Sequence, residues 1–197
     1  MENICSIILA AGKSTRMSSL KPLKMINSAS FLDHTMQNLA KANITKFFVV
    51  VGYRSIDVIN HLSDIVQKDW KAYIVVNENF ELGQFSSLQK VANHLLYREF
   101  DYCLISLIDH PFVKTGTIKK LLDKLDTKPK PKVIIPRHKG ELGHPIIIHK
   151  SIIKAMSNAS ASSNLRLILE KYIGKTEFIN VNDPCVLDNF NYEKDIK

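Results

Sequence analysis

The chain of 197 residues has few cysteines, no sequence repeat and no long hydrophobic run. Its apolar runs are far shorter than the roughly 20 residues of a membrane-spanning helix. Cys5, Cys103 and Cys185 form no CxxC pair, so neither a disulfide scaffold nor a zinc site is indicated, and a reducing, cytoplasmic location is expected. The apolar stretch 4–9 follows Glu2 and no basic residue, which favours a buried strand over a secretory signal.

The chain also lacks an RNA-binding signature and a basic stripe interleaved with aromatic residues. Its net charge is +8, with 27 Lys and Arg against 19 Asp and Glu. The lysines are scattered, apart from one cluster in 124–132. Such a charge is compatible with nucleic acid, with a small polyphosphate, or with ordinary solvated faces. Without a signature for nucleic acid, we do not expect that partner.

Apolar periodicity predicts strands that alternate with helices in a single domain spanning 1–197. Strands are expected at 4–9, 47–51, 72–76, 102–108, 133–135, 145–149 and 177–181. Helices are expected at 31–42, 56–66, 88–96, 118–125, 151–157 and 164–172, with a polar loop at 157–164 and a turn or helix at 192–197. This alternation predicts a mostly parallel sheet with helices on both faces.

Sheets of this kind bind ligands at the carboxyl ends of their strands. Chemistry is therefore expected just after Leu9, Val76, Ile108 and Val181, where four of the predicted strands end.

The first strand runs directly into a loop of small residues, AAGKSTRM at 10–17. Gly12 can take a positive φ, and successive backbone N–H groups there can form a nest for an anion. Lys13, Arg16 and the following Lys21 add positive charge suited to a triphosphate. The loop is neither a Walker A loop nor a GxGxxG fingerprint. A glycine turn with solvated cations is the competing interpretation.

A carboxylate follows the strand expected at 102–108, in the sequence SLIDHP. Asp109 is well placed there to bind Mg²⁺, although an Asp close to a proline also commonly begins a turn. His110 is a possible metal ligand, but a lone histidine in a loop is more often a hydrogen-bonding residue. The pattern leaves both interpretations of Asp109 open.

The segment ELGQFSSLQ at 81–89 combines glycine with hydroxyl groups before an amphipathic helix. Hydroxyls and unpaired N–H groups at a helix N-terminus can contact a base edge or a phosphate. Capping of the helix by Ser86 is the simpler interpretation, but it leaves Ser87 and Gly83 without a role.

The segment KGELGHPIII at 139–148 has the pattern of a β-hairpin. Gly140 and Gly143 bracket its turn, and His144 with Pro145 enters the next strand. The pattern does not decide whether His144 contacts a substrate.

Taken together, AAGKSTRM, the following lysine, GQFSSL, DHP and GHP resemble the MobA-like nucleotidyltransferases, in particular their molybdenum cofactor cytidylyltransferase (MocA-like) branch. The resemblance covers almost the whole chain. Many nucleotidyltransferases share the opening motif, whereas GQFSSL and GHP narrow the match. The resemblance implies a three-layer α/β/α Rossmann-like nucleotidyltransferase fold with a mostly parallel, mixed sheet. It also implies Mg²⁺-dependent transfer of CMP from CTP to a phosphorylated acceptor such as molybdopterin, with release of pyrophosphate.

The resemblance further implies roles for individual residues. Catalysis would depend on Arg16, Lys21 and Asp109, and Asp109 and Asn191 would hold the metal. The opening loop and the GQFSSL segment would bind the nucleotide through Leu9, Ala10, Ala11, Gly12, Lys13, Ser14, Arg16, Lys21, Gly83, Ser86, Ser87 and Leu88. The residues on the acceptor side would be His110, Gly143, His144 and Pro145.

Three positions bear on how far the resemblance extends. Ala11 favours the cytidylyl branch, because relatives that transfer guanylyl groups usually have Gly there. Ser18 stands where the family usually has Gly. Asn191 stands where a second metal-binding Asp is expected, and its uncharged amide should lower the metal affinity, unless Asp188 or Asp195 compensates.

The expected partners are thus a nucleoside triphosphate, with CTP favoured over GTP and ATP, and a phosphorylated small molecule. A membrane is not an expected partner. We expect a monomer, because no heptad pattern appears. Transfer to a sugar or alditol phosphate is one alternative. A nucleotide-binding relative with weak or no transfer activity is another, and Asn191 favours it.

Overall fold

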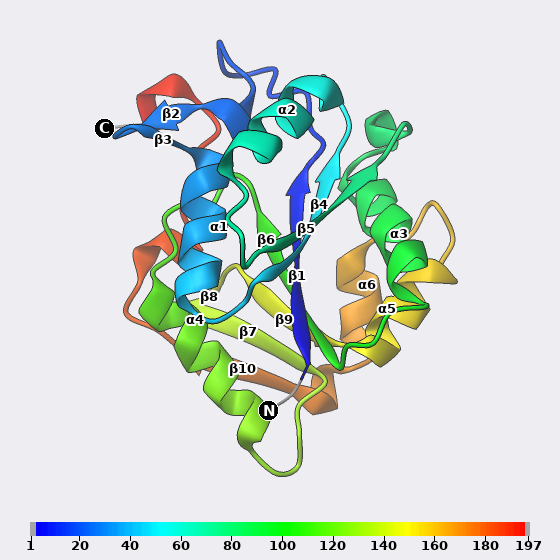
Figure 1. Cartoon of the computed structure of the whole chain (residues 1–197). Coiled ribbons are helices and arrows are strands. Elements are labelled where there is room, and N and C mark those ends of the chain that lie inside the picture. The colour runs from blue at the N-terminus through cyan, green and yellow to red at the C-terminus, as the bar shows by residue number, and fades with distance from the viewer. Residues whose placement is uncertain (1–2, 196–197) are drawn as a thin grey trace.

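The structure is a computed structural model that describes residues 3–195, and its central element is a mixed eight-stranded sheet between two layers of helices (Figure 1). The strands are β1 (Ile4–Ala10), β2 (Met25–Ile26), β3 (Ala29–Ser30), β4 (Lys46–Val51), β5 (Lys71–Val76), β6 (Tyr102–Leu107), β7 (Val133–His138), β8 (Glu141–Leu142), β9 (Ile146–His149) and β10 (Thr176–Asn180). The α-helices are α1 (Phe31–Lys41), α2 (Ser55–Ile65), α3 (Gln84–Leu95), α4 (Thr115–Leu122), α5 (Lys150–Ser157) and α6 (Leu165–Glu170). Short 3₁₀ helices are η1 (Lys21–Leu23), η2 (Phe80–Leu82), η3 (Asp123–Asp126), η4 (Ile173–Lys175), η5 (Pro184–Val186) and η6 (Glu193–Asp195).

The main sheet has the strand order β10-β7-β9-β6-β1-β4-β5, and β8 pairs with β7. β1 lies in the interior of the sheet and pairs in parallel with β4 and β6. β9 is antiparallel to both of its neighbours, β6 and β7. The small strands β2 and β3 form a separate hairpin. The predicted mostly parallel, mixed sheet is therefore confirmed, and the carboxyl ends of β1 and β6 lie side by side.

Alternate residues of β1 serve two hydrophobic layers, as expected for a strand buried on both faces. Ile8 and Ala10 pack with α1, α2 and α4, whereas Ile7 and Leu9 pack with α3, α5 and α6. Ile7 and Ile8 are fully buried. Two helical layers thus hold β1 rigidly, which fixes the position of the loop that follows it.

Most predicted elements are present, and the differences are local. β7 continues through Pro136 to His138, three residues beyond the predicted strand. α3 begins at Gln84, earlier than predicted, and its N-cap is Gly83, so the expected cap at Ser86 is wrong. In the terminal segment predicted at 192–197, η6 is a single 3₁₀ turn, and 196–197 lie outside the described residues.

The predicted hairpin at 139–148 is confirmed in its first half. β7 and β8 pair in antiparallel fashion around a turn at Lys139 and Gly140, both of which have a positive φ. β9 does not continue this hairpin, because it crosses to a place between β6 and β7.

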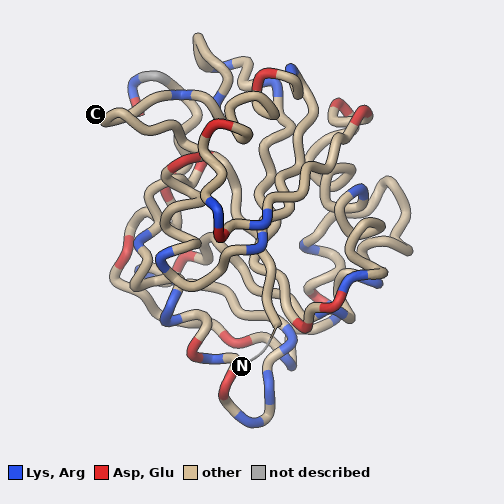
Figure 2. The backbone as a smooth tube through the Cα atoms, in the orientation of Figure 1, with Lys and Arg blue, Asp and Glu red and all other residues tan. Residues whose placement is uncertain are grey.

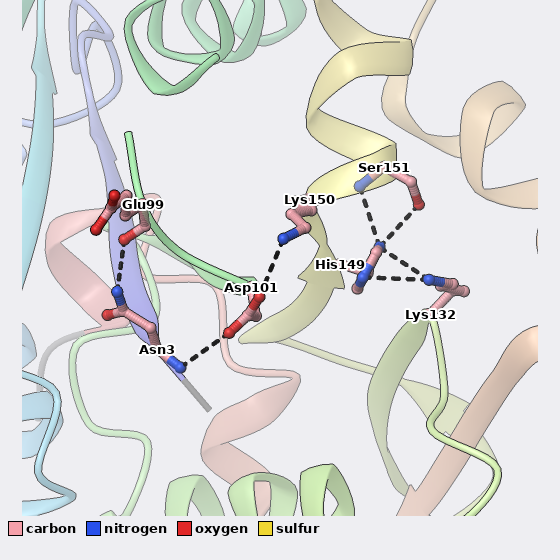
Figure 3. A network of polar contacts seen from close by, with 7 residues as sticks. All are labelled: Asn3, Glu99, Asp101, Lys132, His149, Lys150 and Ser151. Carbon is pink, nitrogen blue, oxygen red and sulfur yellow. Dashed lines mark hydrogen bonds and ion pairs between the residues drawn. The ribbon is translucent and has the colours of Figure 1, made fainter. Parts of the chain in front are cut away.

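A polar network lies at the amino-terminal edge of β6, close to the start of α5 (Figure 3). His149 caps α5, because its Nδ1 atom accepts a hydrogen bond from the backbone N–H of Ser151 (3.1 Å). The Nζ atom of Lys132 lies 3.0 Å from the same Nδ1 atom, and Lys150 pairs with Asp101. This network lies away from the carboxyl ends of β1 and β6.

Positive charge is distributed over much of the molecule (Figure 2). The lysine-rich stretch 124–132 runs through η3 and a loop to the amino end of β7, at the opposite edge of the sheet from the carboxyl ends of β1 and β6. Within residues 3–195, every helix is too short or too polar to cross a bilayer.

Candidate active site

A cavity of about 310 Å³ opens where β1 and β6 end. This volume lies at the lower end of the range for small-molecule sites. Most residues predicted to bind the nucleotide line it, namely Leu9, Ala10, Ala11, Gly12, Ser14, Arg16, Lys21, Gly83 and Ser87, and so do Asp109 and Asn191. Residues that the sequence did not single out complete the lining: Thr15, Pro22, Phe80, Gln84, Leu107 and Ile108.

The loop after β1 lies unusually close to its neighbours. The backbone N–H of Tyr53 donates a hydrogen bond to the Ala11 carbonyl (3.1 Å). A Cβ atom on Gly52 would lie 2.8 Å from that carbonyl oxygen and 2.7 Å from Cβ of Phe80, closer than real Cβ atoms come. Glycine at position 52 therefore permits the loop to approach. Its place at the end of a predicted strand is the only signal in the sequence that could have indicated it.

Gly12 does not have the positive φ that the sequence suggested for it. In this loop, Ser14 has a positive φ instead (55°). The hydroxyl of Ser14 accepts a hydrogen bond from the backbone N–H of Lys21 (2.9 Å). This contact closes the loop into a compact turn and brings Lys21 to the cavity.

Two predicted phosphate ligands converge on one oxygen atom. The Nζ atom of Lys21 lies 2.6 Å from Oδ1 of Asn191, and Nη2 of Arg16 lies 3.1 Å from the same atom. The guanidinium of Arg16 also lies over the ring of Tyr192, 5.4 Å from its centroid. Two neutral groups thus hold the guanidinium of Arg16, and the Asn191 amide also orients the Lys21 ammonium, without neutralising the positive charge of either cation.

Asp109 faces the same group of side chains from the end of β6. Its Oδ2 atom lies 3.6 Å from Nζ of Lys21. Burial lowers the pKa of Lys21, the charge of Arg16 adds to this effect, and the charge of Asp109 opposes it. A buried cation of this kind gains from a second anionic partner, such as a phosphate.

The expected metal ligands fit Mg²⁺ unequally. Within residues 3–195, no three His, Cys, Asp or Glu side chains form a metal cluster. Mg²⁺ needs only one or two carboxylates when substrate phosphates and water complete its shell, so Asp109 fits this role. The amide oxygen of Asn191 fits less well, because it already accepts hydrogen bonds from two cationic side chains. Asp195 accepts hydrogen bonds from the backbone N–H groups of Asn191 and Tyr192, and thereby shapes the turn.

The segment before α3 depends on a residue that sequence reasoning missed. Asn77 follows β5 directly, is 2% exposed, and donates hydrogen bonds to the hydroxyls of Ser86 and Ser87 (both 2.9 Å). Gly83, the N-cap of α3, has φ 95°, a conformation that favours glycine. Ser87 lines the cavity, whereas Ser86 and Leu88 do not. The expectation of chemistry just after Val76 was the signal that could have found Asn77.

Lys13 does not line the cavity. It forms an ion pair with Glu81 of η2, and its Nζ atom lies 5.8 Å from the ring centroid of Phe80. The hydrogen bond to Glu81 raises the pKa of Lys13, and the charge of Glu81 adds to it. This contact joins the opening loop to η2 across one side of the site.

The predicted acceptor residues lie beside Asp109, outside the cavity lining. Nε2 of His110 is 3.8 Å from Oδ1 of Asp109. The ring centroids of His110 and His144 are 5.4 Å apart. Burial lowers the pKa of His110, and it lowers the pKa of His144 to about 4. The Nδ1 atoms of both rings are buried and have no hydrogen-bond partner in the described structure. Both histidines are therefore neutral near pH 7, and each keeps one unused polar atom.

Packing explains the glycine of the GHP motif. A Cβ atom on Gly143 would collide with the carbonyl oxygen of Val186, and the same carbonyl accepts a hydrogen bond from the backbone N–H of His144 (2.9 Å). Gly143 and Pro145 do not line the cavity. Their binding of an acceptor stays a prediction.

The end of the predicted strand at Val181 has a structural role. The Asp183 carboxylate accepts hydrogen bonds from the backbone N–H of Lys114 and the hydroxyl of Thr117, at the start of α4. These residues are not part of the cavity lining. β10 lies at the edge of the sheet, three places from β6, which explains the separation.

Comparison with known proteins places the chain in a family. The family model described as MobA-like NTP transferase domain matches residues 6–176. The molybdenum cofactor cytidylyltransferase of Escherichia coli (strain K12) is 24% identical over 169 residues, covering 86% of this chain and 82% of that protein. The bifunctional protein GlmU of Symbiobacterium thermophilum is 28% identical over 124 residues, covering 62% of this chain and 25% of that protein. The chain thus spans only about a quarter of the length of such GlmU relatives.

Solved structures share the fold. The inositol-1-phosphate CTP transferase from T. maritima matches with a TM-score of 0.75 at 16% identity, and the match covers 100% of this chain and 92% of that chain. At this level of identity, the likeness shows the common α/β architecture.

Proposed function

The chain belongs to the MobA-like NTP transferase domain family, and from this premise we propose that it transfers CMP from CTP to the phosphate of a small acceptor. One observation carries the proposal: Lys21 and Arg16 converge beside the Asp109 carboxylate, in a cavity at the ends of two central strands. Such a group of charges suits a triphosphate with its divalent cation.

In the proposed reaction, an oxygen of the acceptor phosphate attacks the α-phosphorus of CTP in line. A new P–O bond forms, the bond to the bridging oxygen of the β-phosphate breaks, and pyrophosphate leaves with the electron pair. The acceptor phosphate is already ionised near neutral pH, so no general base is required. The protein's contribution is to position the reactants and to neutralise charge.

The residues of the cavity divide this work. Lys21 and Arg16 exchange their contact with Asn191 for contacts with phosphate oxygens, and they stabilise charge on the α-phosphoryl group and on pyrophosphate. Asp109 would hold Mg²⁺, and the bound ion would supply positive charge to the triphosphate. The loop at 10–17 surrounds the phosphates with backbone N–H groups.

The proposed acceptor is a molybdopterin-type phosphate. The similarity to the E. coli molybdenum cofactor cytidylyltransferase over most of both chains supports this choice. The proposal puts the acceptor on the side of Asp109 where Nε2 of His110 lies 3.8 Å from Oδ1 of Asp109. A sugar or alditol phosphate is the second candidate, and it is supported by the likeness to an inositol-1-phosphate CTP transferase.

A pyrophosphate-release assay tests the proposal. CTP, GTP and ATP are each supplied with Mg²⁺, and either a molybdopterin-type acceptor or inositol 1-phosphate is added. We expect turnover with CTP and the molybdopterin-type acceptor, and loss of turnover in Lys21→Met, which keeps the length of the side chain without its charge. Turnover only with inositol 1-phosphate would select the second candidate. Binding of CTP without release under any condition would indicate a relative that has lost transfer activity.

A further inference from the structure

We propose that Asn77 is a positioning residue that directs the hydroxyl proton of Ser87 into the cavity, where it donates to an acceptor atom of the nucleoside. The inference rests on the proposed function, because it concerns how the same cavity reads a nucleotide. Asn77 itself does not line the cavity, whereas Ser87 does.

The orientation of the Asn77 amide follows from its partners. The backbone N–H of Asn79 lies 3.1 Å from Oδ1 of Asn77, and a backbone N–H can only donate. The oxygen of the amide must therefore face Asn79, and the NH₂ group must face the serines. This NH₂ group donates one hydrogen bond to the hydroxyl of Ser86 and one to that of Ser87, and each distance from Nδ2 to the hydroxyl oxygen is 2.9 Å. Asn77 is only 2% exposed, so burial makes this orientation costly to change.

The hydroxyl groups of Ser86 and Ser87 differ in where they can donate their protons. The hydroxyl of Ser86 accepts from Asn77 and is within donating distance of two backbone carbonyls, those of Gly83 (2.8 Å) and Asn79 (3.1 Å). Its single proton is therefore used inside the protein. The hydroxyl of Ser87 also accepts from Asn77, but its proton meets no acceptor among the described residues. Since the Ser87 residue is 4% exposed and lines the cavity, a bound ligand is the available acceptor.

The position of Ser87 indicates which part of the nucleotide it meets. Lys21, Arg16 and Asp109 form one group of charges, joined by their contacts with one another and with Asn191. Ser87 belongs to α3, which follows Phe80 and Gly83 in the chain, and all three residues line the cavity. The charged group takes the phosphates, so the α3 side takes the nucleoside. Cytosine offers carbonyl and ring-nitrogen acceptors there, and the ribose offers hydroxyl oxygens.

Asn77→Asp tests the polarity of this contact without changing the shape of the side chain. The carboxylate still accepts from the backbone N–H of Asn79, but it has no hydrogen to give the serines. The Ser87 proton then turns back to the carboxylate and leaves the ligand acceptor unpaired. We expect the dissociation constant for CTP, measured by calorimetry, to rise roughly tenfold. Asn93→Asp is the matched control, because its exposed side chain accepts from Ser157 in either form; its affinity should equal that of the wild type.

A double-mutant cycle separates the polarity of Ser87 from the added negative charge. In a Ser87→Ala background, Asn77→Asp should change the affinity for CTP less than about twofold, because the hydroxyl through which it acts is absent. Inorganic triphosphate supplies a second arm, and neither variant should weaken its binding. An equal penalty in both backgrounds, or a matching loss of affinity for inorganic triphosphate, would overturn the proposal, because charge alone would then explain the effect.

The experiment keeps the two levels of inference apart. A wild-type protein that does not bind CTP would contradict the proposed function. If the wild-type protein binds CTP, and Asn77→Asp and Ser87→Ala both bind it with the wild-type affinity, only the role of Asn77 is contradicted. If thermal melting shows that Asn77→Asp does not fold, Ser87→Ala alone decides: a roughly tenfold loss for CTP is expected, and unchanged affinity overturns the proposal.

Discussion

Lys21 and Asn191 are 170 positions apart in the sequence, yet the Lys21 ammonium donates a hydrogen bond of 2.6 Å to the Asn191 amide oxygen. Arg16 donates to the same atom, so a neutral side chain holds two cations next to the Asp109 carboxylate. This relationship gives Asn191 a role in ordering the two proposed phosphate ligands, in addition to the metal role predicted from the sequence. It also makes the charge at position 191 a variable that can be tested.

Replacement of Asn191 by Asp should strengthen the binding of Mg²⁺ at this site. The carboxylate keeps the two hydrogen bonds and adds a hard, charged oxygen near Asp109. We expect the Mg²⁺ concentration at half-maximal pyrophosphate release to fall roughly tenfold, in line with one added charge-assisted contact of about 1.5 kcal/mol. Asn189→Asp, an exposed change two positions away, adds the same charge and should leave this concentration unchanged. Equal effects of the two variants would assign the change to general electrostatics.

Loss of either cation should reduce turnover without unfolding the protein. Arg16→Ala and Lys21→Ala each remove a group that we propose neutralises transition-state charge, and we expect at least about a hundredfold lower kcat, by analogy with the loss of an oxyanion donor. Steady-state pyrophosphate release measures the loss, and circular dichroism checks the fold. Lys68→Ala, an exposed change in the loop after α2, is the control. Near-normal turnover in both variants would refute the assignment of these residues.

Gly52→Ala should disturb the opening loop from outside the cavity. The new methyl group would press against the Ala11 carbonyl and Phe80, and overpacking of this kind costs about 1–3 kcal/mol. We expect a lower free energy of unfolding in urea and weaker binding of CTP. Gly174→Ala is the matched control, since an added Cβ there meets no atom within 4 Å, and its unfolding should match the wild type. Unchanged CTP affinity in Gly52→Ala would show that the loop does not depend on this approach.

The free energy of unfolding should decrease as the pH is lowered, because of the titration of His149, which lies in the network of Figure 3. Burial lowers the pKa of His149 below its ordinary value, and the charges of Lys132 and Lys150 lower it further, while Asp101 opposes them. The neutral ring accepts the hydrogen bond that caps α5, so this contribution is present above pH 6.5 and is lost as the pH falls through the lowered pKa.

Urea unfolding at pH 7 and pH 5 measures this dependence. His149→Asn keeps a capping acceptor but does not titrate, so its free energy of unfolding should fall less between the two pH values. His149→Ala removes the cap and should cost about 1 kcal/mol at pH 7. An equal fall in the wild type and in His149→Asn would place the titration elsewhere.

Much of the site could be predicted because it follows strand ends. The loop after Leu9 and the carboxylate at Asp109 each come directly after a predicted strand, and neighbouring parallel strands bring such ends together. The contribution of Asn77 could not be assigned in this way. Its importance lies in the hydrogen bonds to Ser86 and Ser87, and such partners depend on how α3 packs against the end of β5.

The sequence by itself determined the class of fold and the placing of small and polar residues directly after the central strands β1 and β6, because apolar periodicity and small-residue loops act over a few neighbouring positions. Tertiary structure decided the contacts between distant segments: the place of β9 between β6 and β7, the meeting of Lys21 with Asn191, and the packing of Gly143 on Val186. These contacts depend on strand order and side-chain packing across the whole chain, which no local pattern specifies.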